Sequence, residues 1–402
     1  MADDQPGLTL LGKLLVVLVV AGCGYGAWYY FRGAPSTRPS DTGASGVSSG
    51  TTSGPPDVPG GTTIGVSYGT EKQRWFEWAV EDFAKTREGR GIHINLMPMG
   101  SLEGAQAVLN GDQRINVWSP ASSLYKGSFV ADWTLKHSNN PIAREETLAL
   151  TPMVFVFWDE RYQALVKKYP EVSFRTIGQA LDEKSGWESI AGKSEWGLFK
   201  FGHTNPAQSN SGLMTLVLMA IDYNKKCRGL EMKDILDEGF QDWMRRIERG
   251  VTGMSNSTGN MMRDMVLKGP SSFDAVFVYE SVAIDYLKNA EGRWGQLRAI
   301  YPKLNMWSDN PYYVLDTPWS TDAQKKAAGA FADFLMSERV QKQSLTHGFR
   351  PGNPAVSIKT PDSPFVQYSG SGLRVDLTTS CEPPEAAVIS NLLVGWQRST
   401  TR

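Results

Sequence analysis

The residues best suited to bind a ligand lie in a polar loop, residues 202–213, with the sequence GHTNPAQSNSGL. The loop follows a strand-like run and opens an apolar, helix-like run at 213–221. This order points the N–H groups at the start of a helix, and the positive end of its dipole, toward the loop. Ser209, Asn210 and Ser211 add side-chain donors, and together these groups suit an anion or a polar oxygen. Either serine also fits the simpler role of a helix N-cap.

Similar strand–loop–helix units recur along the chain. Residues 62–67, 92–96 and 115–118 have strand patterns and are followed by polar loops, and 274–279 reads as another buried strand. Strands alternating with helices predict an α/β fold with parallel strands.

Two helix starts and one crossing segment are also indicated. Residues 70–73 and 321–324 match the capping-box pattern, which places Thr70 and Thr321 at N-caps. The apolar run 148–158 contains a proline, which favours an edge or crossing segment over a central strand.

Composition limits the class of protein. With 402 residues the chain is too long for one ordinary core, so two lobes are expected. The 41 basic and 42 acidic residues give a net charge of −1, which argues against nucleic-acid binding. The four histidines are scattered and the cysteines lack zinc spacing, so neither a metal nor another cofactor is predicted. The sequence contains no pattern that brings together a nucleophile, a general base and a group to orient the base, so we predict that the protein is not an enzyme.

The N-terminus predicts attachment to a membrane. After a short tail, residues 1–13, the run 14–31 is uncharged and long enough to span a bilayer. An uncleaved transmembrane anchor is the preferred interpretation. The alternative is a lipoprotein, because residues 20–23 match a lipobox in which Cys23 is acylated.

The predicted anchor is followed by a linker and then by a globular head. Residues 34–61 are rich in Gly, Ser, Thr and Pro and predict a flexible tether. Cys227 and Cys381 are the only cysteines of the head. In an oxidising compartment they form a disulfide candidate, and two buried free thiols are the alternative.

Four segments in order resemble a known family. They are residues 117–124, 149–154, 202–213 and 348–351. Together they look like bacterial extracellular solute-binding proteins with the type 2 periplasmic-binding fold, nearest the molybdate-receptor-like branch. The resemblance extends from residue 62 to the mid-350s.

The resemblance implies two α/β lobes joined by two crossover strands. Lobe 1 would comprise 62–149 plus 301–402, and lobe 2 would comprise 150–300. A small polar or anionic solute would bind between them, in a protein tethered to the bacterial inner membrane with an extracytoplasmic head. An ABC permease or another inner-membrane complex is the implied partner, for uptake or sensing. An interaction or assembly module that has lost its ligand is the alternative.

The resemblance also implies a set of ligand-binding residues, each of which has a simpler role as a cap or core residue. Glu280 departs from the oxyanion-binding pattern, because a carboxylate repels an anion; it also suits the start of the next helix. The implied set is Ser67, Tyr68, Thr70, Ser101, Ser119, Ser122, Asn205, Ser209, Asn210, Ser211, Tyr279 and Glu280.

Overall fold

The computed structural model describes residues 60–290, 293–377 and 379–400. The predicted tail and membrane anchor lie outside these residues, as does nearly all of the predicted linker. None of the helices within the described part is both long and apolar enough to cross a bilayer.

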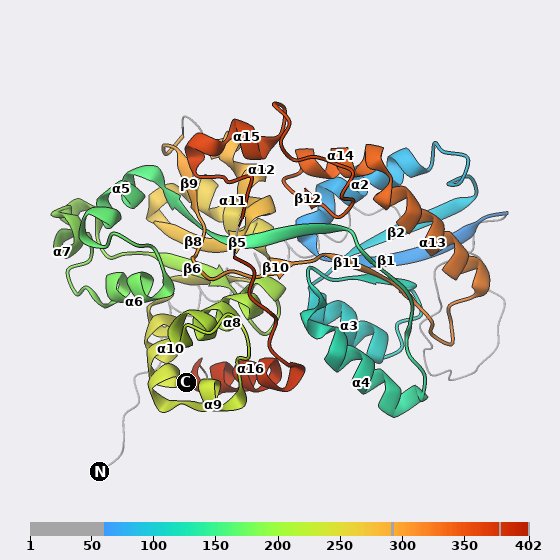
Figure 1. The fold of residues 1–402 in the computed structure, drawn as a ribbon, viewed down its shortest axis with the longest axis horizontal. Coiled ribbons are helices and arrows are strands. Elements are labelled where there is room, and N and C mark those ends of the chain that lie inside the picture. Colours follow the sequence, from blue (N-terminus) through green and yellow to red (C-terminus); the bar gives the residue numbers. More distant parts are fainter. Residues whose placement is uncertain (1–59, 291–292, 378, 401–402) are drawn as a thin grey trace, which may run out of the picture. The chain divides into compact units, whose positions relative to one another are not determined.

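Lobe 1, as we use the term from here on, is built on a five-stranded sheet with the order β2-β1-β3-β11-β4 (Figure 1). β1 pairs in parallel with β2 and β3, as the sequence predicted, whereas β11 is antiparallel to β3 and β4. The strands are β1 (Thr62–Tyr68), β2 (Ile92–Pro98), β3 (Val117–Ser119), β4 (Ile142–Thr147) and β11 (Pro311–Leu315). The helices are η1 (Thr70–Lys72), α2 (Gln73–Phe83), α3 (Ser101–Leu109), η2 (Ser123–Tyr125), α4 (Lys126–His137), α13 (Asp322–Met336) and α14 (Glu338–Thr346).

Lobe 2 is built on a seven-stranded sheet with the path β10-β5-β8-β6-β7, to which β9 and β12 add by pairing with β5. Its strands are β5 (Ala149–Trp158), β6 (Phe201–Thr204), β7 (Gly253–Ser255), β8 (Ala275–Tyr279), β9 (Leu297–Ile300), β10 (Trp307–Ser308) and β12 (Arg350–Pro351). Its helices are α5 (Asp159–Lys168), α6 (Phe174–Asp182), α7 (Trp187–Ala191), η3 (Ser194–Trp196), α8 (Asn210–Asn224), α9 (Met232–Leu236), α10 (Glu238–Gly250), α11 (Thr258–Lys268), η4 (Gly269–Ser271) and α12 (Glu280–Ala290).

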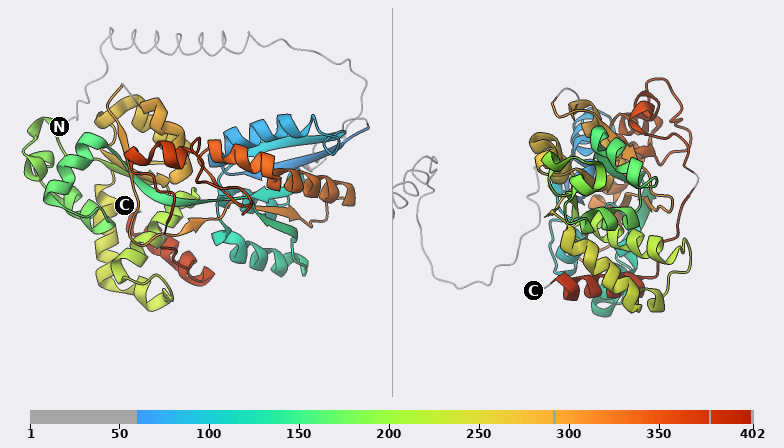
Figure 2. Two further views of the ribbon diagram at one scale, coloured as in Figure 1. Left: turned by 45° about the horizontal axis from the view of Figure 1, so that its top comes forward. Right: turned by 90° about the vertical axis from the view of Figure 1, so that its left-hand side faces the viewer.

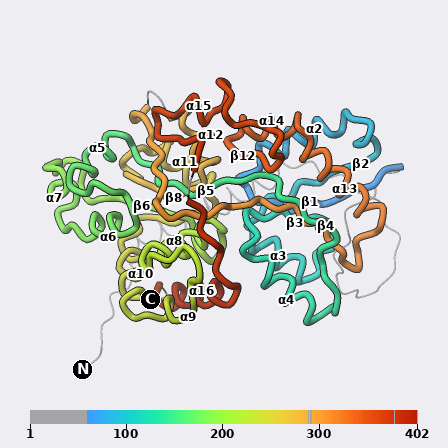
Figure 3. Tube along the Cα trace, in the orientation of Figure 1, coloured from blue at the N-terminus to red at the C-terminus, as the bar shows by residue number. Residues whose placement is uncertain are grey.

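β5 connects the two lobes (Figure 3). Its first residues pair with β12 and β10, and its last six residues pair with β8 and β9. Pro152 lies opposite Trp307 in the β10 pairing, where the strand passes from one lobe to the other. The proline therefore marks a crossing segment, although β5 also becomes an interior strand of the second sheet.

Two local predictions need correction. The strand-like run expected before the polar loop 202–213, at residues 197–201, is displaced, since β6 begins at Phe201, extends into the loop and is preceded by irregular residues. Thr70 is not an N-cap: it begins the 3-10 turn η1, and α2 starts at Gln73 without a side-chain cap. The capping box at Thr321 is confirmed, because Thr321 and Gln324 bond each other's backbone amides.

The C-terminal segment does not stay with lobe 1, as the expected division placed it. After β12 it forms α15 (Pro364–Gln367), η5 (Ser369–Ser371) and α16 (Ala386–Thr400), and α16 packs on α8, α9 and α10 of lobe 2 (Figures 1 and 2). Its apolar residues Val388, Leu392 and Trp396 are buried there. Burial of this apolar stripe against lobe 2 decides the placement of the segment.

A disulfide fixes the path of this segment. Cys227, just after α8, is bonded to Cys381, five residues before α16, with an S–S distance of 2.11 Å. The two cysteines are 154 residues apart in sequence, so the bond closes a loop that runs from α9 of lobe 2 through β11, α13 and α14 of lobe 1 and back to lobe 2.

Candidate functional site

A small cavity lies where loops of the two lobes meet. Its volume is about 40 Å³, roughly three times what one water molecule needs. A cavity of this size suits an ion or a ligand of a few heavy atoms. Lobe 1 contributes Gly69, Thr70, Glu71, Met99, Gly100, Ser101 and Ala121, and lobe 2 contributes Ser209, Asn210, Asn256, Ser257, Thr258 and Tyr279.

Three helices of eight or more residues begin at this cavity. α3 starts at Ser101, α8 at Asn210 and α11 at Thr258, and all three residues line it. α8 is buried on all sides from Asn210 to Ile221, so its N-terminus lies inside the protein. Ser209 makes no side-chain cap bond to α8, which leaves first-turn amides of that helix oriented toward the cavity. Converging helix N-termini give the cavity a positive potential without a cationic side chain among its lining residues.

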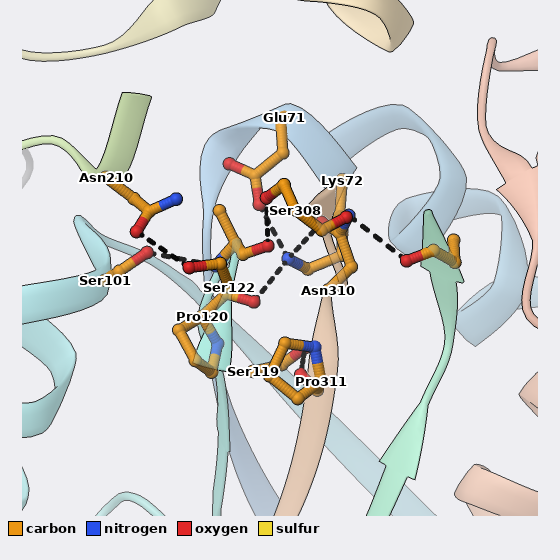
Figure 4. Close-up of polar contacts among 12 residues, drawn as sticks. Glu71, Lys72, Ser101, Ser119, Pro120, Ser122, Asn210, Ser308, Asn310 and Pro311 are labelled. Carbon is orange, nitrogen blue, oxygen red and sulfur yellow. Dashed lines mark hydrogen bonds and ion pairs between the residues drawn. The ribbon is translucent and has the colours of Figure 1, made fainter. Parts of the chain in front are cut away.

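Asn210 connects the lobes at the edge of the cavity. Its Nδ2 donates to the hydroxyl of Tyr279 at 2.7 Å. Its Oδ1 accepts from Ser122 Oγ of lobe 1 at 3.1 Å, and this bond is drawn in Figure 4. The side chain of Asn210 is therefore held in one orientation by residues from both lobes.

Hydroxyl groups behind the cavity form a chain of hydrogen bonds. Ser211 Oγ lies 2.5 Å from Thr204 Oγ1, 3.0 Å from Ser209 Oγ and 2.8 Å from Thr258 Oγ1. Ser211 is fully buried and does not line the cavity. It thus positions two cavity residues, Ser209 and Thr258, and does not itself reach the cavity.

An ion pair lies beside the cavity in lobe 1. Lys72 is fully buried, and its Nζ donates to Glu71 Oε1 at 2.6 Å, Pro120 O at 3.1 Å and Asn310 Oδ1 at 3.2 Å (Figure 4). Glu71 lines the cavity. Because Lys72 neutralises it, the carboxylate repels an anion much less than an unpaired one would.

Burial sets the protonation behaviour of two groups at this site. Burial lowers the pKa of Lys72, and the neighbouring Glu71 carboxylate opposes that change. The pKa of Tyr279 is raised well above its usual value, mainly by burial and secondly by Glu71, so its hydroxyl stays protonated. Tyr279 is thus a neutral hydrogen-bonding group at the cavity wall.

Five of the twelve implied ligand residues line the cavity: Thr70, Ser101, Ser209, Asn210 and Tyr279. Ser122 and Ser211 support them as described above. Ser67 and Tyr68 are buried in β1, where the Tyr68 ring packs on Phe76 at 5.3 Å. The remaining polar groups serve local structure, since Ser119 Oγ donates to Pro311 O and Asn205 Oδ1 accepts from the amide of Ala207.

Glu280 faces away from the cavity and begins α12. It is fully buried, and Arg350 binds it in a bidentate manner, with Nε to Oε2 at 2.8 Å and Nη2 to Oε1 at 2.7 Å. Tyr301 also donates to Glu280. Burial raises the pKa of Glu280, and the Arg350 guanidinium opposes this. The repulsion expected between Glu280 and an anion therefore does not arise at the cavity.

Sequence analysis missed the contribution of one loop. Asn256, Ser257 and Thr258 line the cavity between β7 and α11. The available signal was the Ser257–Thr258 pair before the helix, where Ser257 Oγ accepts from the amide of Asn260 as an N-cap. The preceding strand β7 has only three residues, too few for an alternating pattern to reveal it.

A larger chamber, lined by residues of α2, α11 and α12, adjoins the cavity. This chamber has a volume of about 610 Å³ and shares Thr70, Glu71 and Ser257 with the cavity. Arg74 of lobe 1 approaches Asp285 of lobe 2 across it, at 3.9 Å. Burial raises the pKa of Asp285 to about 6.

Comparisons with known proteins agree with this architecture. Residues 64–350 match the family model of the bacterial extracellular solute-binding proteins, and the chain belongs to that family. The members of this family are binding proteins and not enzymes, with extracytoplasmic globular parts, and the family works with ABC transporters. No curated protein matches the sequence.

Several solved structures share the fold. The sulfate-binding protein SubI from Mycobacterium tuberculosis is 16% identical, with a TM-score of 0.51 over 73% of this chain and 88% of that one. Iron-bound HitA from Pseudomonas aeruginosa is 14% identical, with a TM-score of 0.53 over 84% and 99%. A periplasmic thiamin binding protein is 11% identical, with a TM-score of 0.58 over 87% and 99%. At these identities the likeness establishes the two-sheet fold, and the ligand has to be argued from the site.

Proposed function

We propose that the protein captures a small polar or anionic solute in the cavity between its lobes, for ABC-type uptake or for sensing. The observation that carries the proposal is the convergence of three helix N-termini and several hydroxyl groups on one cavity of about 40 Å³. Backbone N–H groups and hydroxyls bind oxyanions without a full countercharge. The sulfate-binding relative and the resemblance to the molybdate-receptor-like branch support the same ligand class.

The proposal includes a tether to the bacterial inner membrane through residues 14–31, with the head outside the cytoplasm. The support is the apolar sequence of that segment and the family to which the head belongs. The alternative, a lipoprotein acylated at Cys23, predicts a mature chain that begins at that residue. Intact-mass measurement of the purified protein distinguishes the two.

A ligand-free interaction or assembly module is the second candidate. It is favoured by the extent to which polar groups at the cavity already bond one another: both amide atoms of Asn210 have partners within the protein. Such a module would have the same fold and would bind a membrane complex as its partner, without binding a solute.

Thermal unfolding with molybdate, sulfate, phosphate, amino acids and sugars separates these candidates. A solute that binds the folded state stabilises it by about 2.7 kcal/mol at a concentration one hundred times Kd, which raises Tm by several degrees. We expect one of the oxyanions to give the largest rise. If no compound in the panel changes Tm, the solute-binding proposal is wrong for this chain and the interaction module is favoured.

A further inference from the structure

A second pocket lies in lobe 2, among α9, α10 and α16. Its volume is about 370 Å³, within the range of small-molecule sites. It shares no residue with the cavity or the chamber of the cleft. One wall is α16, which lies beyond the region matched by the family model, residues 64–350. The family alone therefore does not account for this pocket.

The walls of the pocket are held in place by contacts behind it. Trp396 of α16 donates from Nε1 to Glu248 Oε2 of α10 at 2.8 Å, and both residues are buried. Glu248 also contacts the buried His203 of β6, at 3.1 Å. The Cys227–Cys381 bond fixes the segment that leads into α16. The pocket is thus formed by the folded structure before any ligand arrives, which lowers the entropic cost of binding.

The lining has a strongly positive character. Arg245, Arg249 and Arg398 line the pocket, and no aspartate or glutamate is among its twelve lining residues. Arg245 is paired with Asp242 on the same helix. Among the described residues, neither Arg249 nor Arg398 has a salt-bridge partner, and both are exposed. Two guanidinium groups therefore remain able to bind an anion.

The pocket also has an apolar surface. Met244 and Leu392 are buried at its base, whereas Leu236 is 55% exposed and Val394 is 39% exposed. Both exposed side chains belong to the lining, so they present apolar surface next to the arginines. A bare inorganic anion would use the guanidinium groups and leave this surface in contact with water.

We propose that this pocket binds an organic anion that carries a carboxylate or phosphate on an apolar body. Arg249 and Arg398 would hold the anionic group, because the guanidinium fork donates two parallel hydrogen bonds to such groups. Leu236 and Val394 would cover the apolar body, and burying that body adds affinity in proportion to the area removed from water. The site is independent of the solute in the cleft.

Isothermal titration of the full-length protein with butyl phosphate tests the proposal. We expect saturable binding with a Kd below about 1 mM, and weaker binding of both inorganic phosphate and butanol. The double variant Arg249→Gln, Arg398→Gln should lose at least tenfold in affinity. Arg246→Gln is the matched control: Arg246 is an exposed arginine on α10 outside the pocket lining, and its loss should leave affinity unchanged.

The proposal is wrong if butyl phosphate shows no saturable binding, if inorganic phosphate binds with equal affinity, or if the double variant retains full affinity. Thermal unfolding verifies that each variant is folded. An Asn210→Ala variant, altered in the cleft, should bind butyl phosphate normally; if it does not, the anion binds in the cleft and the second site is wrong.

Discussion

The backbone of the β2–α3 loop packs directly on the other lobe at Gly100. A Cβ placed on Gly100 would lie 2.6 Å from the carbonyl oxygen of Gln208. Gly100 has φ −62° and ψ 151°, a conformation that alanine adopts without strain. The obstacle to a side chain at this position is therefore the opposite lobe and not the local backbone.

The Gly100→Ala variant should weaken solute binding by keeping the lobes apart. Ordinary contact begins near 3.4 Å, so the loops must separate by about 0.8 Å at this point. Overpacking of this kind costs about 1–3 kcal/mol. If that cost falls on the closed, ligand-bound form, affinity drops by about 5- to 150-fold.

Calorimetric titration with the oxyanion that gives the largest thermal shift measures this effect. Gly259→Ala is the matched control, because Gly259 lines the outer chamber and a Cβ there meets nothing within 4 Å. It should bind like the wild type. Alanine is a poorer N-cap than glycine, so Gly100→Ala can also lower Tm without ligand, and affinity is the deciding readout. Wild-type affinity in Gly100→Ala would refute the inference that binding requires this contact between the lobes.

Two further predictions concern stability. Replacing Cys227 and Cys381 by serine opens a loop of about 155 residues. Loop-closure entropy gives an upper estimate of about 5 kcal/mol for the resulting loss in unfolding free energy. Denaturant titration with and without reductant measures this loss, and identical unfolding midpoints under the two conditions would contradict the bond. His203 is buried with both ring nitrogens facing acceptors, and the Glu248 carboxylate raises its pKa against the effect of burial. The stabilising contribution of His203 is therefore complete below about pH 6.5 and is lost as pH rises through the higher pKa of the folded state. A His203→Gln variant should lack this part of the pH dependence of the unfolding free energy. If the variant shows the same pH dependence as the wild type, the charged pair of His203 and Glu248 is wrong.

Much of the fold could be predicted because it follows from local patterns. Strands at 62–67 and 274–279 have short apolar runs bounded by polar loops, and both are strands in the structure. The helix starting near 321 has a capping box that satisfies its first amides locally. Thr70 has the same sequence pattern but is not an N-cap, because its segment forms the 3-10 turn that buries Lys72 against Pro120 and Asn310.

The candidate site was predictable as a set of loops and less so as a set of side chains. The loops after β1, β2, β3 and β6 all reach the cavity, and β8 reaches it with its last residue, Tyr279, as expected for the carboxyl ends of strands in an α/β sheet. At the start of α8, Ser209 and Asn210 line the cavity, whereas the next residue, Ser211, only supports the residues that line it. The direction in which each side chain points depends on the phase of the helix and on the packing around it, and the local sequence pattern determines neither.

The sequence by itself determined the α/β class, the presence of polar loops that begin helices, and the two cysteines available to bond. Only the tertiary structure decided which groups are neutralised. Glu280 is paired with Arg350, 70 residues away, and Lys72 is bonded to Asn310, 238 residues away. Whether a carboxylate repels an anion or forms a buried ion pair depends on such distant partners, because the pairing exists only once the chain has folded.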